Sequence, residues 1–223
     1  MLVLFIIIMI GGAFIWFIAE QKKQKDQFKK MNESFKSMMD YIFRQDTVII
    51  DTETTGLTKR SEVIEISIIN LKGEVLFNSL IKPMVRMSND SKAVKIHGIT
   101  NDQLKGKPTW ADVHDQICAI LEDKVVISYN AAFDARLIEQ TARKHGLKSP
   151  ILHLECAMMI YSFWHGEKSH KEGYKWHKLE DACHYLGIKI RGKSHQALTD
   201  CFLTLNMLNN IKNKDILWRR KFL

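Results

Sequence analysis

Five residues in three short motifs have the side chains needed to hold divalent cations and to move a proton. Asp51 and Glu53 lie in DTETTGL (51–57), Asp134 ends YNAAFD (129–134), and His195 and Asp200 belong to HQALTD (195–200). Four carboxylates brought together repel one another, so such a cluster is most stable when it binds cations. We therefore predict a metal-dependent site for phosphodiester cleavage, a reaction that paired cations support.

A strand is expected to present the first two carboxylates. Residues 47–50 (TVII) are β-branched and apolar and lead directly into the first motif, which is typical of a buried strand. Side chains alternate between the two faces of a strand, so Asp51 and Glu53 point to the same face. Both carboxylates can therefore enter one site.

Two helices are expected to bring the remaining groups to that strand. The apolar run 125–129 predicts a strand, and Asp134 opens the helix after it, within reach of a neighbouring strand's end. Asp200 lies one turn inside a helix predicted over 196–210. His195 precedes that helix, so we expect its imidazole to reach the rim of the acidic pocket from a loop.

The order of the predicted elements indicates an α/β fold. A meander of three strands comes first, and strands and helices alternate after it, which fits a sheet covered by helices. The strands are expected at 47–50, 63–71, 74–81 and 125–129, with a short apolar segment at 151–154. The helices are expected at 111–122, 133–145 and 196–210, with two further helical stretches before the last.

The three motifs resemble those of the DEDDh 3′–5′ exonucleases, and among these the proofreading (epsilon) subunit of bacterial DNA polymerase III and its stand-alone relatives. The resemblance covers about residues 47–208 and also includes IHGIT (96–100), KPTWADV (107–113) and KLEDACHYLGI (178–188). A single Asp-x-Glu is common, but three motifs in this order, with IHGIT between the first two, are a specific signal. One departure is Tyr129, where many relatives have histidine.

The resemblance implies a fold, a cofactor and a reaction. The fold would be an RNase H-like mixed sheet flanked by helices. Two divalent cations, Mg²⁺ or Mn²⁺, would bind Asp51, Glu53, Asp134 and Asp200, and nucleoside 5′-monophosphates would leave stepwise from a 3′ end, with single-stranded DNA as the favoured substrate. Imidazole changes protonation between pH 5 and 8, so His195 is suited to take a proton from water. By analogy, four residues would line the pocket for the terminal nucleotide: Thr54, Thr55, Leu57 and His97.

The run from Leu2 to Ala19 contains no charged residue, and five lysines follow it within residues 22–30. As a helix it would be about 27 Å long, close to the ~30 Å hydrocarbon thickness of a bilayer. A buried core helix is the alternative, but it would need apolar cover on every face. No basic segment or small-residue cleavage site flanks the run, which disfavours a signal peptide. We therefore expect a single-pass transmembrane anchor (residues 1–19) in the inner (cytoplasmic) membrane, with the catalytic domain facing the cytoplasm because of the lysines.

The segment after the apolar run predicts a basic amphipathic helix. Five apolar residues recur at alternating steps of three and four and would share one helix face: Phe28, Met31, Phe35, Met38 and Ile42. This face could lie on a membrane surface, pair with a second copy of the chain or dock on the catalytic domain. The sequence does not choose among the three.

Basic residues are concentrated at the end of the chain. The net charge is +8, and residues 211–223 have five Lys or Arg against one Asp. A basic protein suits a polyanionic partner, either nucleic acid or an anionic membrane. The segment 165–178 mixes four lysines with Tyr174 and Trp176, a composition that can hold single-stranded nucleic acid or form an ordinary solvated loop. The four cysteines have no paired spacing, so free thiols are expected.

Together these features predict a membrane-anchored 3′–5′ exonuclease. The chain divides into an anchor (1–19), a juxtamembrane helix (20–46), an exonuclease domain (47–210) and a basic tail (211–223). Two alternatives stay open: an RNA-trimming exoribonuclease on the same scaffold, and a nucleic-acid-binding membrane tether without turnover. The five filled catalytic positions argue against the tether.

Overall fold

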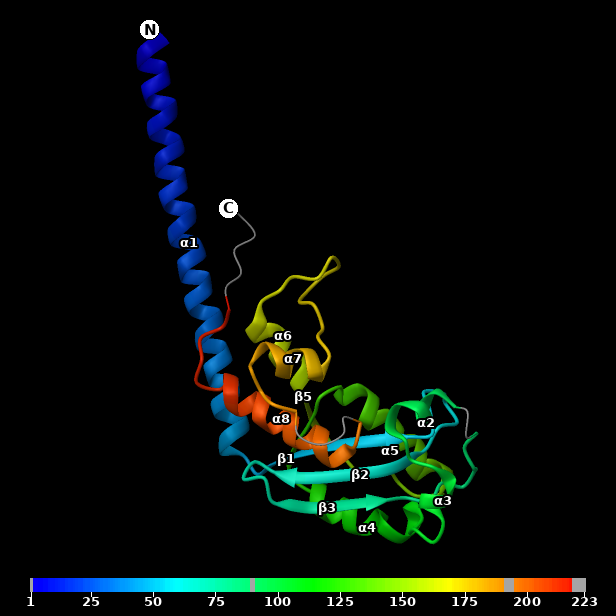
Figure 1. Cartoon of the computed structure of the whole chain (residues 1–223). Coiled ribbons are helices and arrows are strands. Elements are labelled where there is room, and N and C mark those ends of the chain that lie inside the picture. The colour runs from blue at the N-terminus through cyan, green and yellow to red at the C-terminus, as the bar shows by residue number, and fades with distance from the viewer. Residues whose placement is uncertain (1, 89–90, 191–194, 218–223) are drawn as a thin grey trace.

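The computed structural model describes residues 2–88, 91–190 and 195–217, with side chains described from Phe14 onward. At its centre is a mixed five-stranded sheet of order β3-β2-β1-β4-β5 (Figure 1). β1 pairs antiparallel with β2, and β2 with β3, whereas β1 pairs in parallel with β4, and β4 with β5. The strands are β1 (Thr47–Thr54), β2 (Val63–Asn70), β3 (Val75–Leu80), β4 (Val125–Ser128) and β5 (His153–Cys156).

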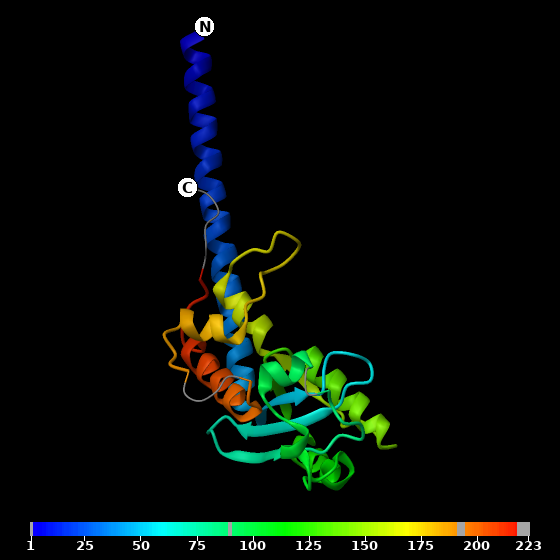
Figure 2. The same cartoon turned by 45° about the vertical axis from the view of Figure 1, so that its right-hand side comes forward.

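Helices cover both faces of this sheet (Figures 1 and 2). Two of them, α4 (Trp110–Leu121) and α5 (Ala131–Lys144), pack over the face that bears Ile50. The opposite face, which bears Ile49, is covered by α1 (Leu2–Arg44), α6 (Ala157–His165) and α8 (Ala197–Ile211). Three short helices complete the fold: α2 (Lys92–His97), α3 (Asn101–Leu104) and α7 (Leu179–Tyr185).

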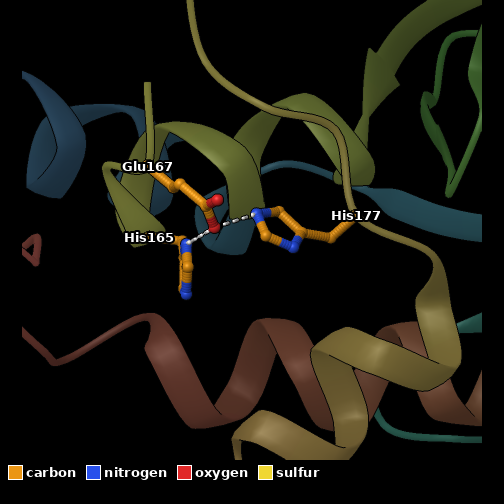
Figure 3. Close-up of side chains that lie close together, drawn as sticks. All are labelled: His165, Glu167 and His177. Atoms are coloured by element: carbon orange, nitrogen blue, oxygen red, sulfur yellow. Dashed lines mark ion pairs between the residues drawn. The ribbon is translucent and has the colours of Figure 1, made fainter. Parts of the chain in front are cut away.

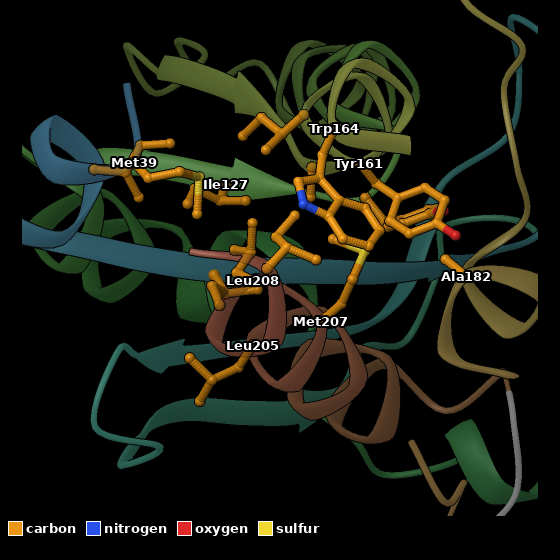
Figure 4. Close-up of a cluster of buried hydrophobic side chains, with 14 of the residues drawn as sticks. Met39, Ile127, Tyr161, Trp164, Ala182, Leu205, Met207 and Leu208 are labelled. Atoms are coloured by element: carbon orange, nitrogen blue, oxygen red, sulfur yellow. The ribbon is translucent and has the colours of Figure 1, made fainter. Parts of the chain in front are cut away.

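The larger core lies between the sheet and the helices α1, α6 and α8 (Figure 4). Met39 from α1, Ile127 from β4, Trp164 from α6 and Leu208 from α8 are all buried there. Each buried apolar side chain of this size contributes roughly 1.5–3 kcal/mol to folding. This packing holds α8, which carries Asp200, firmly against the sheet.

The second half of α1 docks on the domain, and its first half projects away from it (Figures 1 and 2). Phe35, Met39 and Ile42 are buried in the larger core, with Phe28 and Met31 packed at its edge. The amphipathic face expected within 20–46 therefore contacts the catalytic domain in this structure.

The prediction that residues 1–19 form a transmembrane anchor is wrong. Within the part of the chain that the structure describes, no helix combines the length and the hydropathy that a bilayer span requires. The apolar run is not an element of its own, because it begins a 43-residue helix that continues through charged turns to Arg44. The side chains of residues 1–13 lie outside those described, and Phe14–Ile18 are exposed. The predicted location in the inner membrane, with the domain facing the cytoplasm, depended on this anchor and is therefore wrong as well.

The start of the basic tail runs back along α1. The Ile216 backbone N–H donates to Asn32 Oδ1 at 3.0 Å, and Lys36 pairs with Asp215 at 2.7 Å. These contacts bind the tail to the docked half of α1. Residues 218–223, the most basic part of the predicted tail, lie outside the described residues.

Candidate active site

β1 presents two carboxylates on one face and a hydroxyl on the other. Asp51 and Glu53 lie on the same face of the strand as Ile49, which faces α8. Thr52 lies between them on the opposite face, together with Ile50, which faces α4 and α5. The expected common face for the two carboxylates is therefore present, and the intervening hydroxyl is available to the other layer.

α8 and the residue before it bring an imidazole and a third carboxylate to Glu53. The ligand-type atoms of Glu53, His195 and Asp200 all lie within 4.8 Å of one another. His195 is exposed and has a left-handed backbone conformation with φ of 59°. Such conformations cost roughly 1–3 kcal/mol in a non-glycine residue and concentrate at functional sites.

Asp134 reaches the site from the first turn of α5. It is buried, and the hydroxyl of Thr52 donates to its Oδ1 at 2.7 Å. The hydroxyl of Ser128, the last residue of β4, donates to its Oδ2. Because β1 and β4 are adjacent parallel strands, their carboxyl ends together hold both oxygens of this carboxylate.

These groups line a single cavity of about 700 Å³. The lining includes all five residues expected to be catalytic: Asp51, Glu53, Asp134, His195 and Asp200. Residues far apart in the sequence therefore converge on one site.

Burial and mutual repulsion make the β1 carboxylates reluctant to ionise. Burial is the largest cause for Asp51, whose pKa is raised well above its usual value, and the charges of Asp134 and Asp200 add to it. Burial, followed by the charges of Asp200 and Glu65, raises the pKa of Glu53 to about 8.

The other two carboxylates are shifted less, because each has a partner that favours its charge. Burial raises the pKa of Asp134 to about 6 against the opposing hydrogen bonds from Ser128 and Thr52. Burial likewise raises the pKa of Asp200 to about 6 against the opposing charge of His195. Cations in the cavity would relieve this repulsion, so the donor set fits divalent metal ions.

The four residues expected to line the nucleotide pocket are not among the side chains that line this cavity. The hydroxyls of Thr54 and Thr55 hydrogen-bond to backbone groups of the following loop. Leu57 is 76% exposed, and His97 is buried with its Nδ1 accepting a backbone hydrogen bond. Ile96, beside His97, does line the cavity. The role of these four residues stays a prediction.

Sequence reasoning missed two further acidic residues: Glu180, which lines the cavity, and Glu65, whose charge acts on Glu53 from β2. Glu65 lies opposite Glu53 in the register of β1 with β2. Its Oε2 accepts a hydrogen bond of 3.2 Å from the backbone of Ala197, the first residue of α8, and burial raises its pKa. The signal was a charged residue inside the otherwise apolar strand VIEISIIN.

Part of the cavity wall comes from the loop between α6 and α7. Trp176, which is 68% exposed, and Lys178 line the cavity from this loop. The hydroxyl of Tyr129 donates to the backbone oxygen of His177 at 2.9 Å. Tyr129, the departure noted in the second motif, thus ties this loop to the end of β4.

Related sequences match most of the domain. A family model described as an exonuclease, RNase T, matches residues 48–208. The uncharacterized exonuclease CP81 of Escherichia phage 186 is 39% identical over 170 residues, which cover 74% of this chain and 87% of that protein. DNA polymerase III subunit epsilon of Aquifex aeolicus is 27% identical over 189 residues, covering 81% of this chain and 86% of that protein.

Solved structures share the fold. Exonuclease I superposes with a TM-score of 0.62 at 17% identity, over 76% of this chain and 41% of that chain. Exonuclease X in complex with 5′ overhanging duplex DNA gives a TM-score of 0.56 at 23% identity, over 75% of this chain and 92% of that chain. The fold is thus the RNase H-like mixed sheet flanked by helices that the motifs implied. With its carboxylates converging on one cavity and the family model spanning the domain that holds them, the chain belongs to the RNase T family of exonucleases.

Proposed function

We propose that this chain is a metal-dependent 3′–5′ exonuclease of the DEDDh type that releases nucleoside 5′-monophosphates from the 3′ ends of DNA. The observation that carries the proposal is the convergence of four carboxylates and one imidazole on a single cavity. These groups are Asp51, Glu53, Asp134, Asp200 and His195. Their arrangement on an exonuclease fold favours hydrolysis over binding without turnover.

The carboxylates would hold two cations, with Mg²⁺ or Mn²⁺ as the fitting ions. Both ions prefer oxygen ligands, which Asp51, Glu53, Asp134 and Asp200 supply. Two such cations, when bound, activate a water molecule and stabilise the leaving 3′ oxygen. The raised pKa values of Glu53 and Asp200 mean that bound cations would stabilise the ionised carboxylates.

His195 would act as the general base. Its exposed imidazole lies at the cavity rim, beside the carboxylates of Glu53 and Asp200. Those charges stabilise the imidazolium that forms when His195 accepts a proton from water. Its place in a loop leaves the ring free to pass that proton to solvent.

Trp176 and Lys178 would hold the substrate strand. An exposed indole can stack on a base, and an ammonium group can neutralise a phosphate. Exonuclease I has been solved with a dA16 oligonucleotide, and exonuclease X with 5′ overhanging duplex DNA. These complexes favour DNA as the substrate of the present protein.

The decisive experiment compares matched DNA and RNA oligonucleotides labelled at the 5′ end, with Mg²⁺, with Mn²⁺ and with a chelator. We expect metal-dependent shortening by one nucleotide at a time, release of deoxynucleoside 5′-monophosphates and faster digestion of DNA. Asp51→Asn should stop the reaction, whereas Asp115→Asn, a change at a fully exposed carboxylate, should not. Faster digestion of RNA would make the protein an exoribonuclease. Binding without release of mononucleotides would refute catalysis.

A further inference from the structure

A second cluster of metal-ligand side chains lies outside the catalytic set. His165, Glu167 and His177 each offer one ligand atom, and these three atoms lie within 4.8 Å of one another. His165 Nδ1 is 3.9 Å and His177 Nε2 is 3.6 Å from the same oxygen, Glu167 Oε2. Figure 3 shows the two imidazoles pointing at this one oxygen from different sides.

The local fold explains why these three residues meet. His165 is the last residue of α6, and Gly166 ends the helix in a left-handed conformation with φ of 72°. The chain therefore turns back and places Glu167 beside the helix end. A hairpin follows, in which the Lys175 backbone N–H donates to the Glu167 backbone oxygen at 2.9 Å. This pairing brings His177 back beside His165 and Glu167.

The two oxygens of Glu167 have different partners. Oε1 accepts a hydrogen bond of 2.8 Å from the Lys175 ammonium, whereas Oε2 faces the two imidazoles. The lysine keeps the carboxylate ionised and its hydrogen bond lowers the pKa of Glu167. In metal sites an outer partner of this kind orients a ligand without occupying its coordinating atom.

Aromatic rings fix the orientation of both imidazoles. Tyr161 stacks on His165 with ring centroids 5.4 Å apart and meets the edge of His177 at 5.5 Å. Tyr185 meets His165 edge-on at 4.7 Å. The rings of His165 and His177 are themselves in edge contact at 4.5 Å. Ring packing therefore fixes both imidazoles beside Glu167.

We propose that His165, Glu167 and His177 form a zinc-binding site, with a water molecule as the fourth ligand. Two imidazoles and one carboxylate suit Zn²⁺, whereas Mg²⁺ prefers oxygen ligands alone. Ligand atoms around a tetrahedral zinc ion lie roughly 3.3–3.5 Å apart, given bonds of about 2.0–2.2 Å. The two carboxylate–imidazole distances, 3.9 and 3.6 Å, exceed this spacing by a few tenths of an ångström, and the two imidazole nitrogens lie within 4.8 Å of each other.

The site would position the loop that carries Trp176 and Lys178 into the catalytic cavity. His177 is the residue between them, so a metal bond at its Nε2 restricts both neighbours. The same backbone also accepts the hydrogen bond from Tyr129. Zinc would thus order the loop that carries Trp176 and Lys178 without binding to the catalytic carboxylates.

The test measures zinc binding by competition with a chromophoric chelator. It uses the full chain with Glu53→Gln and Asp200→Asn, which remove two of the four carboxylates of the catalytic site. We expect one equivalent of bound zinc. Adding Glu167→Gln or His177→Gln should abolish it, whereas His170→Gln, a change at an exposed histidine of the same loop, should not. Zinc binding that is unaffected by the first two changes would overturn the site.

Cobalt provides a measurement that does not depend on how those variants fold. Co²⁺ bound to the Glu53→Gln, Asp200→Asn chain should give the intense visible absorption of a four-coordinate ion, and zinc should displace it. A weak six-coordinate spectrum, or no bound cobalt, would refute the proposal. Magnesium-dependent nuclease activity of the unaltered chain is a separate readout. Its absence beside intact zinc binding would count against the proposed function alone.

Discussion

The hydroxyl of Thr52 donates a 2.7 Å hydrogen bond to Asp134, on the face of β1 opposite to the two carboxylates that flank it. Asp51 and Glu53 face α8, where Asp200 lies, and Thr52 faces α5, which carries Asp134. One short strand therefore joins acidic groups from both helical layers. Position 52, between the two carboxylates, therefore has a structural reason to carry a hydroxyl group.

Thr52→Val should impair the site while preserving side-chain shape. Without this donor the burial of Asp134 is offset only by the hydrogen bond from Ser128 and by those from the backbone of residues 52 and 134, so the pKa of Asp134 should rise above about 6. The acid limb of the pH–rate profile should move to higher pH, and the rate at neutral pH should fall by about 10- to 100-fold. Thr47→Val, which removes a hydroxyl hydrogen bond at the other end of the strand, is the control. An unchanged profile for Thr52→Val would refute the role of this contact.

The metal-free protein should be more stable near pH 5 than near pH 8. The folded pKa of Glu53 is raised from 4.5 to about 8, and those of Asp134 and Asp200 from 3.8 to about 6. The folded state thus holds protons more tightly than the unfolded chain does, so stability is lost as the pH rises through the folded pKa values. Thermal unfolding in a chelator should show this fall in Tm. Glu53→Gln should flatten it and Mg²⁺ should reverse it, whereas a Tm that rises over this range would contradict the electrostatics.

The strands were predictable because their residues carry a strong local signal. The expected strands at 63–71 and 74–81 are observed as β2 and β3, with a turn at residues 71–72 between them. The expected helix at 196–210 is observed as α8. The short helices α2 and α3 were not expected, since four to six residues give too little periodicity to detect.

Other features could not be read from local patterns because they depend on tertiary contacts. The Thr52–Asp134 hydrogen bond joins residues 82 positions apart, and the Glu65 carboxylate meets α8 across 132 positions. The anchor prediction failed for a related reason. Composition gives the apolar character of a segment, whereas the helix that contains it continues to Arg44 and does not, over the described residues, combine the length and hydropathy of a bilayer span.

His195→Ala should reduce turnover without removing the metal ligands. A positioned general base contributes roughly 10²- to 10⁴-fold, so kcat should fall by that factor at neutral pH. The concentration of Mg²⁺ needed for half-maximal rate should change little, because the four carboxylates are intact. His170→Ala serves as the control for loss of an exposed imidazole. Equal rates for His195→Ala and the unaltered protein across pH would exclude this residue as the base.

Trp176→Ala should weaken binding of single-stranded DNA. Stacking of a base on an aromatic ring is worth about 1–3 kcal/mol, so Kd should rise by roughly 5- to 150-fold. Fluorescence anisotropy with a labelled oligonucleotide, in the Asp51→Asn background to prevent cleavage, measures this change. Trp176→Phe keeps an aromatic face and should retain most of the affinity. If the alanine variant binds as tightly as its parent, the indole does not contact the substrate.

The docked half of α1 should be essential for stability, whereas residues 1–19 should not. Ile42 is fully buried in the larger core beside Phe35, and truncating a buried Ile to Ala costs about 2–5 kcal/mol. Ile42→Ala should therefore lower the denaturant midpoint, whereas Tyr41→Ala, at the exposed neighbouring position, should not. Deletion of residues 1–19 leaves the buried stripe intact and should preserve both the midpoint and the nuclease rate. A large loss of stability on that deletion would mean that the projecting part of α1 supports the fold through contacts beyond this stripe.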